Sequence, residues 1–180
     1  MLYIVTALKP EAQAFVDYHK NLKKEKLDNF TIFKNKKLTL IISHLGVANA
    51  RVATQTLINH FDITDDDIYC NIGICGAASK YPIGALLNIG SLTYNDNSYQ
   101  LSNAPEHLTC CDEAIQTNKY NTVDMESFGF YDAVVHNPAI KKAYIFKVVS
   151  DHFEPHKVNK EKTKSLIFNT IDAINEQINF

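Results

Sequence analysis

Carboxylates stand at several points of this sequence where an apolar run ends or a helix begins. Glu11 follows the first apolar run, Asp124 and Glu126 flank a methionine just before a helix-like segment, and Asp151 follows the last apolar run. A fixed carboxylate can transfer a proton as a general acid or base, or accept hydrogen bonds from hydroxyl groups. Because ligands of α/β sheets bind at the carboxyl ends of the strands, these residues are the first candidates for chemistry.

Two glycine-containing segments, 43–46 and 73–77, end apolar runs in the same way. Their glycines can equally be strand-end turns without a ligand, since glycine adopts torsions that other residues avoid. The carboxylates have similar structural explanations: Glu11 and Glu126 suit the positive end of a helix dipole, and Asp151 suits a cap. No single position decides between structure and function.

The elements that would hold these residues alternate between strand and helix. We expect strands over 2–7, 31–33, 38–43, 68–74, 85–94, 107–111 and 143–149, and helices from Pro10, over 48–60, over 127–135 and, as one long closing helix, over 160–178. Segment 95–105 is expected to be a polar loop, and the Lys-rich segments 20–26 and 157–164 are expected to be solvated helix faces. This alternation predicts an α/β fold with a mainly parallel sheet covered on both faces.

Length and composition fit one packed domain. The chain has 180 residues, of which 46% are hydrophobic and 21% charged. Its net charge of −2 provides no general attraction to nucleic acid or to an anionic membrane. No apolar run is long enough to cross a bilayer and the N-terminus does not resemble a secretory signal, so we expect a cytoplasmic protein.

Neither a disulfide framework nor a metal site is expected. The four cysteines form no CxxC pair, which favours reduced thiols. His152 and His156 have the spacing of metal ligands on a helix, but Pro155 lies between them and disfavours that helix.

Five segments follow one another along the chain: ALKPE, SHLGVANA, NIGICGAA, VDMES and VVSD. Together they resemble the signature segments of the purine nucleoside phosphorylase and nucleosidase superfamily, and most of all its 5′-methylthioadenosine/S-adenosylhomocysteine nucleosidase branch. The resemblance implies one nucleoside phosphorylase/nucleosidase-like domain over residues 1–180. Its implied architecture has three layers, a central mixed and mainly parallel sheet flanked by helices.

The resemblance also implies a role for each carboxylate. Asp151, oriented by Ser150, would protonate or hydrogen-bond N7 of a purine while the glycosidic bond breaks. Glu11 would hold and activate the attacking water. Glu126 would accept hydrogen bonds from the ribose 2′ and 3′ hydroxyls, with Met125 packed against the sugar. Acid and base on opposite sides of the bond follow the logic of glycoside hydrolysis.

Four further substrate contacts are implied, at Leu45, Cys75, Gly76 and Ile115. In this superfamily an Asp at position 151 accompanies 6-aminopurines, so the implied reaction is hydrolysis of an adenine nucleoside to adenine and a free sugar. 5′-Methylthioadenosine and S-adenosylhomocysteine are the leading substrates. The chemistry needs no cofactor, and relatives are commonly homodimers in which the partner chain closes the 5′ end of the site.

Two alternatives stay open. A phosphorylase needs cationic donors around phosphate, and Arg51 is the only Arg in the chain, which favours water as the nucleophile. A non-catalytic nucleoside-binding relative is suggested by segment 95–122, which is short for the family and carries no aromatic at the implied base-stacking positions Ala114 and Ile115. Retention of all three carboxylates argues against a binder without activity.

Overall fold

Four parallel strands form the centre of the sheet. The computed structural model describes residues 1–180. The neighbours run in the order β4 (Leu38–Ile42), β1 (Leu2–Thr6), β5 (Ile68–Ala77) and β10 (Lys142–Asp151), and each pair is parallel. Every residue of β1 and β4 is buried, as expected for strands covered on both faces. The carboxyl ends of all four strands therefore lie at one edge of the sheet.

A hairpin extends this sheet at one side. Strand β3 (Phe30–Lys34) pairs antiparallel with β4, and β2 (Lys23–Leu27) pairs antiparallel with β3. The expected helix over 20–26 is wrong, because this segment finds its backbone hydrogen bonds on β3. Its lysines are exposed on an edge strand, where charge discourages pairing with other chains.

On its other side the sheet closes on itself. Strands β6 (Leu86–Tyr94), β8 (Glu106–Cys110) and β9 (Thr122–Asp124) connect β10 back to β5, which completes a ring of five strands. The sheet is mixed, as expected, but parallel pairings do not predominate: five of the ten are antiparallel. The expected open, three-layer arrangement is thus not confirmed for the whole sheet.

The predicted polar loop over 95–105 contains a further strand. Strand β7 (Asn97–Gln100) pairs antiparallel with β6 through the two-residue turn Asn95–Asp96. Both turn residues have positive φ, 48° and 62°, a conformation that Asn and Asp tolerate and that tight hairpins require.

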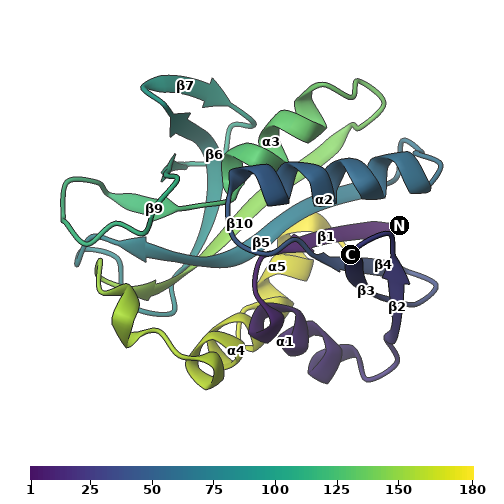
Figure 1. Ribbon diagram of the computed structural model, residues 1–180, viewed down its shortest axis with the longest axis horizontal. Helices are drawn as coiled ribbons and strands as arrows, with labels where there is room; N and C mark the ends of the chain where they lie inside the picture. The colour runs from purple at the N-terminus through teal and green to yellow at the C-terminus, as the bar shows by residue number, and fades with distance from the viewer.

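Helices cover both faces of the central strands (Figure 1). On one side lie α2 (Val47–His60) and α3 (Ser127–Val135), and on the other α1 (Lys9–His19), α4 (Lys160–Phe168) and α5 (Ile171–Ile178). Alternate residues of β1 serve the two sides: Tyr3 and Val5 belong to one apolar cluster, Leu2 and Ile4 to the other. No helix combines the length and the apolar character that crossing a membrane requires.

The closing helix is broken in two, unlike the single helix predicted. The backbone N–H and the Oγ1 of Thr170 both donate to the carbonyl of Ile167, which forms a turn in place of the continuing helical ladder. Segment 157–164 is α-helical only from Lys160, and Lys157 belongs to the short 3₁₀ helix Pro155–Lys157.

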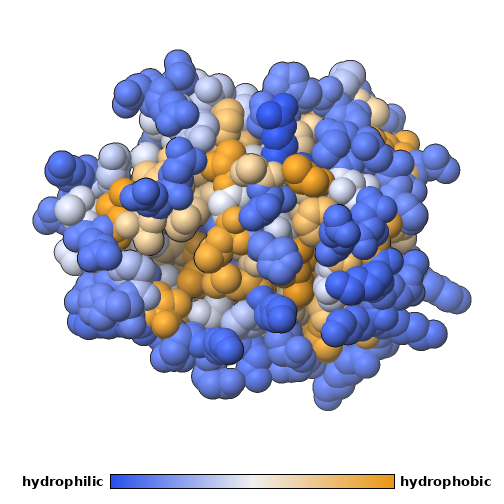
Figure 2. Space-filling model, in the orientation of Figure 1, coloured by the Kyte–Doolittle hydropathy of each residue, from blue (hydrophilic) through white to orange (hydrophobic).

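In the view of Figure 2, hydrophobic residues gather in the centre of one face and hydrophilic residues surround them.

Candidate active site

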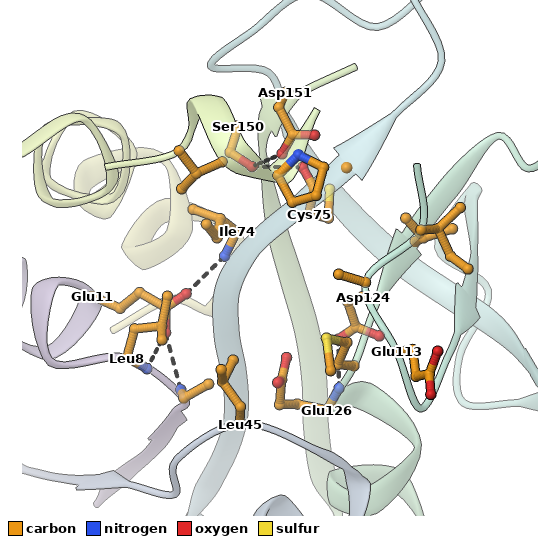
Figure 3. A pocket seen from close by; sticks show the side chains of 18 residues that line it. Leu8, Glu11, Leu45, Ile74, Cys75, Glu113, Asp124, Glu126, Ser150 and Asp151 are labelled. Atoms are coloured by element: carbon orange, nitrogen blue, oxygen red, sulfur yellow. Dashed lines mark hydrogen bonds between the residues drawn. The ribbon is translucent and has the colours of Figure 1, made fainter. Parts of the chain in front are cut away.

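A cavity of about 280 Å³ opens at the carboxyl ends of β1, β5 and β10. This is near the lower end of the size range of small-molecule sites. All nine residues predicted to act on or bind substrate line it: Glu11, Leu45, Cys75, Gly76, Ile115, Met125, Glu126, Ser150 and Asp151. Figure 3 shows Asp151 and Ser150 at one end, Glu126 at the opposite end and Glu11 to one side between them.

Backbone amides hold the Glu11 carboxylate in place. Its Oε2 accepts hydrogen bonds from the N–H groups of Ala7 (3.0 Å) and Leu8 (2.8 Å), and its Oε1 from the N–H of Ile74 (3.0 Å). The side chain is only 2% exposed. Burial raises the pKa of Glu11 above its ordinary value even though these hydrogen bonds act in the opposite direction. Glu11 is thus fixed in position and more basic than a solvated glutamate.

Gly73 makes room for this carboxylate. A Cβ built at Gly73 would lie 2.9 Å from Glu11 Oε1, closer than side-chain carbons normally approach. Gly76 lies farther along β5, where a Cβ would meet Val123 at 3.2 Å and Asp151 at 3.5 Å. These two glycines let the walls of the cavity approach closely.

Glu126 lies where β9 meets α3 and is buried beside two other charged groups. Its Oε1 accepts a hydrogen bond from the N–H of Gly46, the residue that precedes α2, at 3.0 Å. Burial, followed by the charge of Asp124, raises the pKa of Glu126 to about 7, while the positive charge of Lys147 acts against the increase. Near neutral pH this carboxyl group therefore exchanges between protonated and ionised forms.

Asp124 and Lys147 form a buried ion pair behind Glu126. Lys147 Nζ lies 2.8 Å from Asp124 Oδ2, and both side chains are 1% exposed. Burial alone would lower the pKa of Lys147, but the negative charges of Asp124 and Glu126 outweigh it and raise the pKa above its ordinary value. The lysine is therefore charged although it lies in the protein interior.

Asp151 ends β10 and has a donor at each carboxylate oxygen. The Oγ of Ser150 donates to Oδ2 at 2.7 Å, and the N–H of Glu154 donates to Oδ1 at 2.7 Å. The same serine Oγ lies 3.1 Å from the carbonyl oxygen of Cys75. These contacts orient Asp151, which is 8% exposed, while it remains part of the cavity wall.

The remaining lining is mostly apolar, and none of the eighteen lining residues is Lys, Arg or aromatic. Burial raises the pKa of the Cys75 thiol, so it is uncharged. Arg51 does not line the cavity; its Nε lies 2.7 Å from Asp132 on α3. All four cysteines are free. No group of three or more His, Cys, Asp or Glu side chains is arranged to hold a metal ion.

Three charged residues of this region were not assigned a role from the sequence. Asp124 is the second residue of the VDMES segment. Lys147 interrupts the apolar run of β10, and this unusual position for a lysine is the one signal that the sequence offers. Glu113 lines the cavity from the loop between β8 and β9, and its side chain makes no hydrogen bond or ion pair. Nothing in the sequence around it indicated this position.

Comparisons with known proteins find similarity in structure only. No protein-family model and no curated protein matches the chain. A 5′-methylthioadenosine/S-adenosylhomocysteine nucleosidase from Colwellia psychrerythraea, in complex with adenine, matches with a TM-score of 0.80 and 15% identity over 99% of this chain and 94% of its own.

Two further structures match equally well. The corresponding nucleosidase from S. pneumoniae, with a transition-state inhibitor, has a TM-score of 0.81 and 14% identity over 98% of this chain and 97% of its own. Futalosine hydrolase from Helicobacter pylori has a TM-score of 0.82 and 12% identity over 99% of this chain and 97% of its own. The chain therefore has the fold of these two nucleosidases and of futalosine hydrolase.

Proposed function

We propose that the protein hydrolyses the N-glycosidic bond of an adenine nucleoside, with 5′-methylthioadenosine, S-adenosylhomocysteine or a related compound as its substrate. One observation carries the proposal: Asp151, Glu126 and Glu11 converge on a single cavity, with Asp151 and Glu126 at opposite ends (Figure 3). That separation suits a nucleoside whose base lies against Asp151 and whose ribose lies against Glu126.

The proposed reaction separates the work among three carboxyl groups. As the C1′–N9 bond breaks, its electron pair leaves with the base, and Asp151 donates a proton or hydrogen bond to N7. The ribose acquires oxocarbenium character, and a water held by Glu11 forms the new bond to C1′ while its proton passes to Glu11. The raised pKa of Glu11 suits a proton acceptor, and the free Oε2 of Glu126 suits a ribose hydroxyl.

The charge of the lining supports water over phosphate as the nucleophile. A phosphate ion requires cationic or multiple N–H donors, whereas the cavity wall carries five carboxylates and no Lys or Arg. The single arginine is occupied by Asp132 outside the cavity. A phosphorylase is therefore the less favoured activity.

The test is chromatography of the products from a panel of nucleosides: 5′-methylthioadenosine, S-adenosylhomocysteine, adenosine and, because a futalosine hydrolase shares the fold, futalosine. We expect adenine and a free sugar from at least one adenine nucleoside, at a rate independent of phosphate. Phosphate-dependent release of a sugar phosphate would establish the phosphorylase instead. Binding without release of any base would favour the non-catalytic alternative.

A further inference from the structure

The pair Lys147–Asp124 is almost completely buried, and stability does not explain it. Taking both charges out of water is costly, and apolar side chains of similar size often stabilise a protein as well as a buried ion pair does. Both side chains are 1% exposed, and Lys147 stands on β10 in register with Gly73 of β5 and Leu87 of β6. A charged residue in such a position calls for a functional reason.

The contacts of Asp124 connect the pair to the neighbouring Glu126. Besides Lys147, its carboxylate accepts hydrogen bonds from the Ser127 N–H (2.9 Å) and Oγ (2.6 Å) and from the Glu126 N–H (3.3 Å). These bonds define the turn from β9 into α3 that carries Glu126. Lys147 thus connects this turn to β10, which β5 separates from β9 in the ring.

We propose that Lys147 and Asp124 are a positioning pair that aims Glu126 into the cavity and sets its charge. The assignment of Glu126 to the ribose rests on the proposed function, whereas the coupling between the pair and Glu126 does not. Lys147 does not line the cavity, so it acts through Asp124 and through its charge.

The two members of the pair act on Glu126 with opposite signs. The negative charge of Asp124 favours protonated Glu126, and the positive charge of Lys147 favours the ionised form. The other groups that face Glu126 are the Gly46 N–H at the start of α2, the Glu11 carboxylate on α1, and, across the cavity, Asp151 on β10 and Glu113 before β9. Lys147 is the only cation among them.

Two single variants separate this role from a purely structural one. In Lys147→Met, loss of the cation should move the protonation midpoint of Glu126 to higher pH by about one unit, a tenfold change in proton affinity. In Asp124→Asn, loss of the anion leaves Lys147 unopposed and should move the midpoint to lower pH. General damage to the fold would not produce shifts of opposite sign.

The measurement is a pH titration of the protein labelled with ¹³C in its glutamate carboxyl groups, followed by NMR, with the Glu126 signal assigned by its loss in Glu126→Gln. Lys142→Met serves as the control. Lys142 begins the same strand, but its side chain is 43% exposed and it stands at the opposite end of β10 from the cavity. It should leave the midpoint unchanged. Each variant tests the direction of one shift in the Glu126 midpoint. If one variant fails to fold, the other still tests the proposal. Unchanged midpoints in the folded variants would overturn the proposal.

Activity provides an independent measurement. The acid limb of kcat/KM should follow the same shifts, and Lys147→Met should recover activity as the pH is raised, which a misplaced turn would not do. If the wild-type protein cleaves no nucleoside, the proposed function fails, while the NMR titration still decides whether the pair controls Glu126.

Discussion

At the scale of single residues, the three carboxylates differ in what surrounds them, and this separates their chemistry. Glu11 accepts three backbone N–H bonds and is rigid, Glu126 has one such bond and a free oxygen, and Asp151 is oriented by Ser150 and by a backbone amide. These surroundings suit the proposed roles of a fixed base for Glu11, a hydroxyl acceptor for Glu126 and an oriented acid for Asp151.

Replacing Asp151 by Asn should reduce turnover by about two to four powers of ten, the usual contribution of a general acid. The amide retains the shape of the side chain and removes its proton, so substrate binding should change much less than the rate. Single-turnover adenine release measures the chemical step directly. A rate within twofold of wild type would remove Asp151 from the proposed role.

The raised pKa of Glu126 also has a consequence for stability. Its folded-state pKa of about 7 exceeds the value of roughly 4.3 expected in the unfolded chain, so the unfolded chain ionises first as the pH rises. The contribution of Glu126 to stability is therefore full below about pH 4 and is lost as the pH rises to about 7. Glu126→Gln abolishes this loss and should stabilise the protein by roughly 3 to 4 kcal/mol at pH 8 but little at pH 4.

Thermal unfolding at several pH values tests this expectation. Glu176→Gln, an exposed change on α5, is the control and should leave the pH dependence as it is. Glu126→Gln should at the same time weaken ribose binding. Equal stability of wild type and Glu126→Gln at pH 8 would contradict the buried, costly carboxylate seen here.

At the scale of elements, the starts of three helices deliver groups to the cavity. Backbone amides of Ala7 and Leu8 precede α1, Gly46 precedes α2, and Glu126 precedes α3. The last two helices approach so closely that a Cβ on Gly129 would lie 2.0 Å from the carbonyl oxygen of Val47. Packing between helices therefore determines where the Gly46 amide meets Glu126.

The contact between β5 and α1 makes Gly73→Ala an informative change. The added methyl group would press on Oε1 of Glu11, whose carboxylate is held by three hydrogen bonds and cannot move freely. We expect kcat to fall by about a hundredfold, a typical cost of displacing a catalytic group by an ångström, with a small loss of thermal stability. Steady-state kinetics beside a melting curve measure both. Undiminished kcat in a folded variant would argue against Glu11 as the base.

At the scale of the whole molecule, the chain leaves large apolar side chains exposed at the cavity and on α2. Leu45, which lines it, is 53% exposed, and Val52 on α2 is 55% exposed. A second copy of the chain would bury such residues, in line with the homodimer that the family resemblance implies. The cytoplasmic location stays a prediction from the sequence.

Light scattering after gel filtration tests the dimer. We expect a mass of twice 20.3 kDa for the wild type. Val52→Glu should shift the equilibrium towards monomers, because it places a charge where an apolar contact is expected. A similar change on the opposite side of the molecule, Phe168→Glu, is the control, since Phe168 ends α4 and is 41% exposed. A monomeric wild type would reject the dimer.

Local patterns determined much of this protein. Apolar runs predicted the central strands, the helix over 127–135 has the predicted bounds, and all nine proposed site residues line one cavity. These features depend on short-range periodicity and on the rule that parallel strands end at a common edge, both of which a sequence displays. The roles of those nine residues stay proposals.

Only the tertiary structure decided how distant segments pair. Ring closure pairs β10 with β6 and β9 with β5. Segment β2 is a strand because it pairs with β3. The role proposed for Lys147 depends on its ion pair with Asp124, which is distant in sequence. Hydrogen bonding between strands and the desolvation of charges depend on partners brought together by the whole fold. The sequence by itself therefore determined the candidate groups and most of the elements, and the tertiary structure decided their neighbours and hence their ionisation.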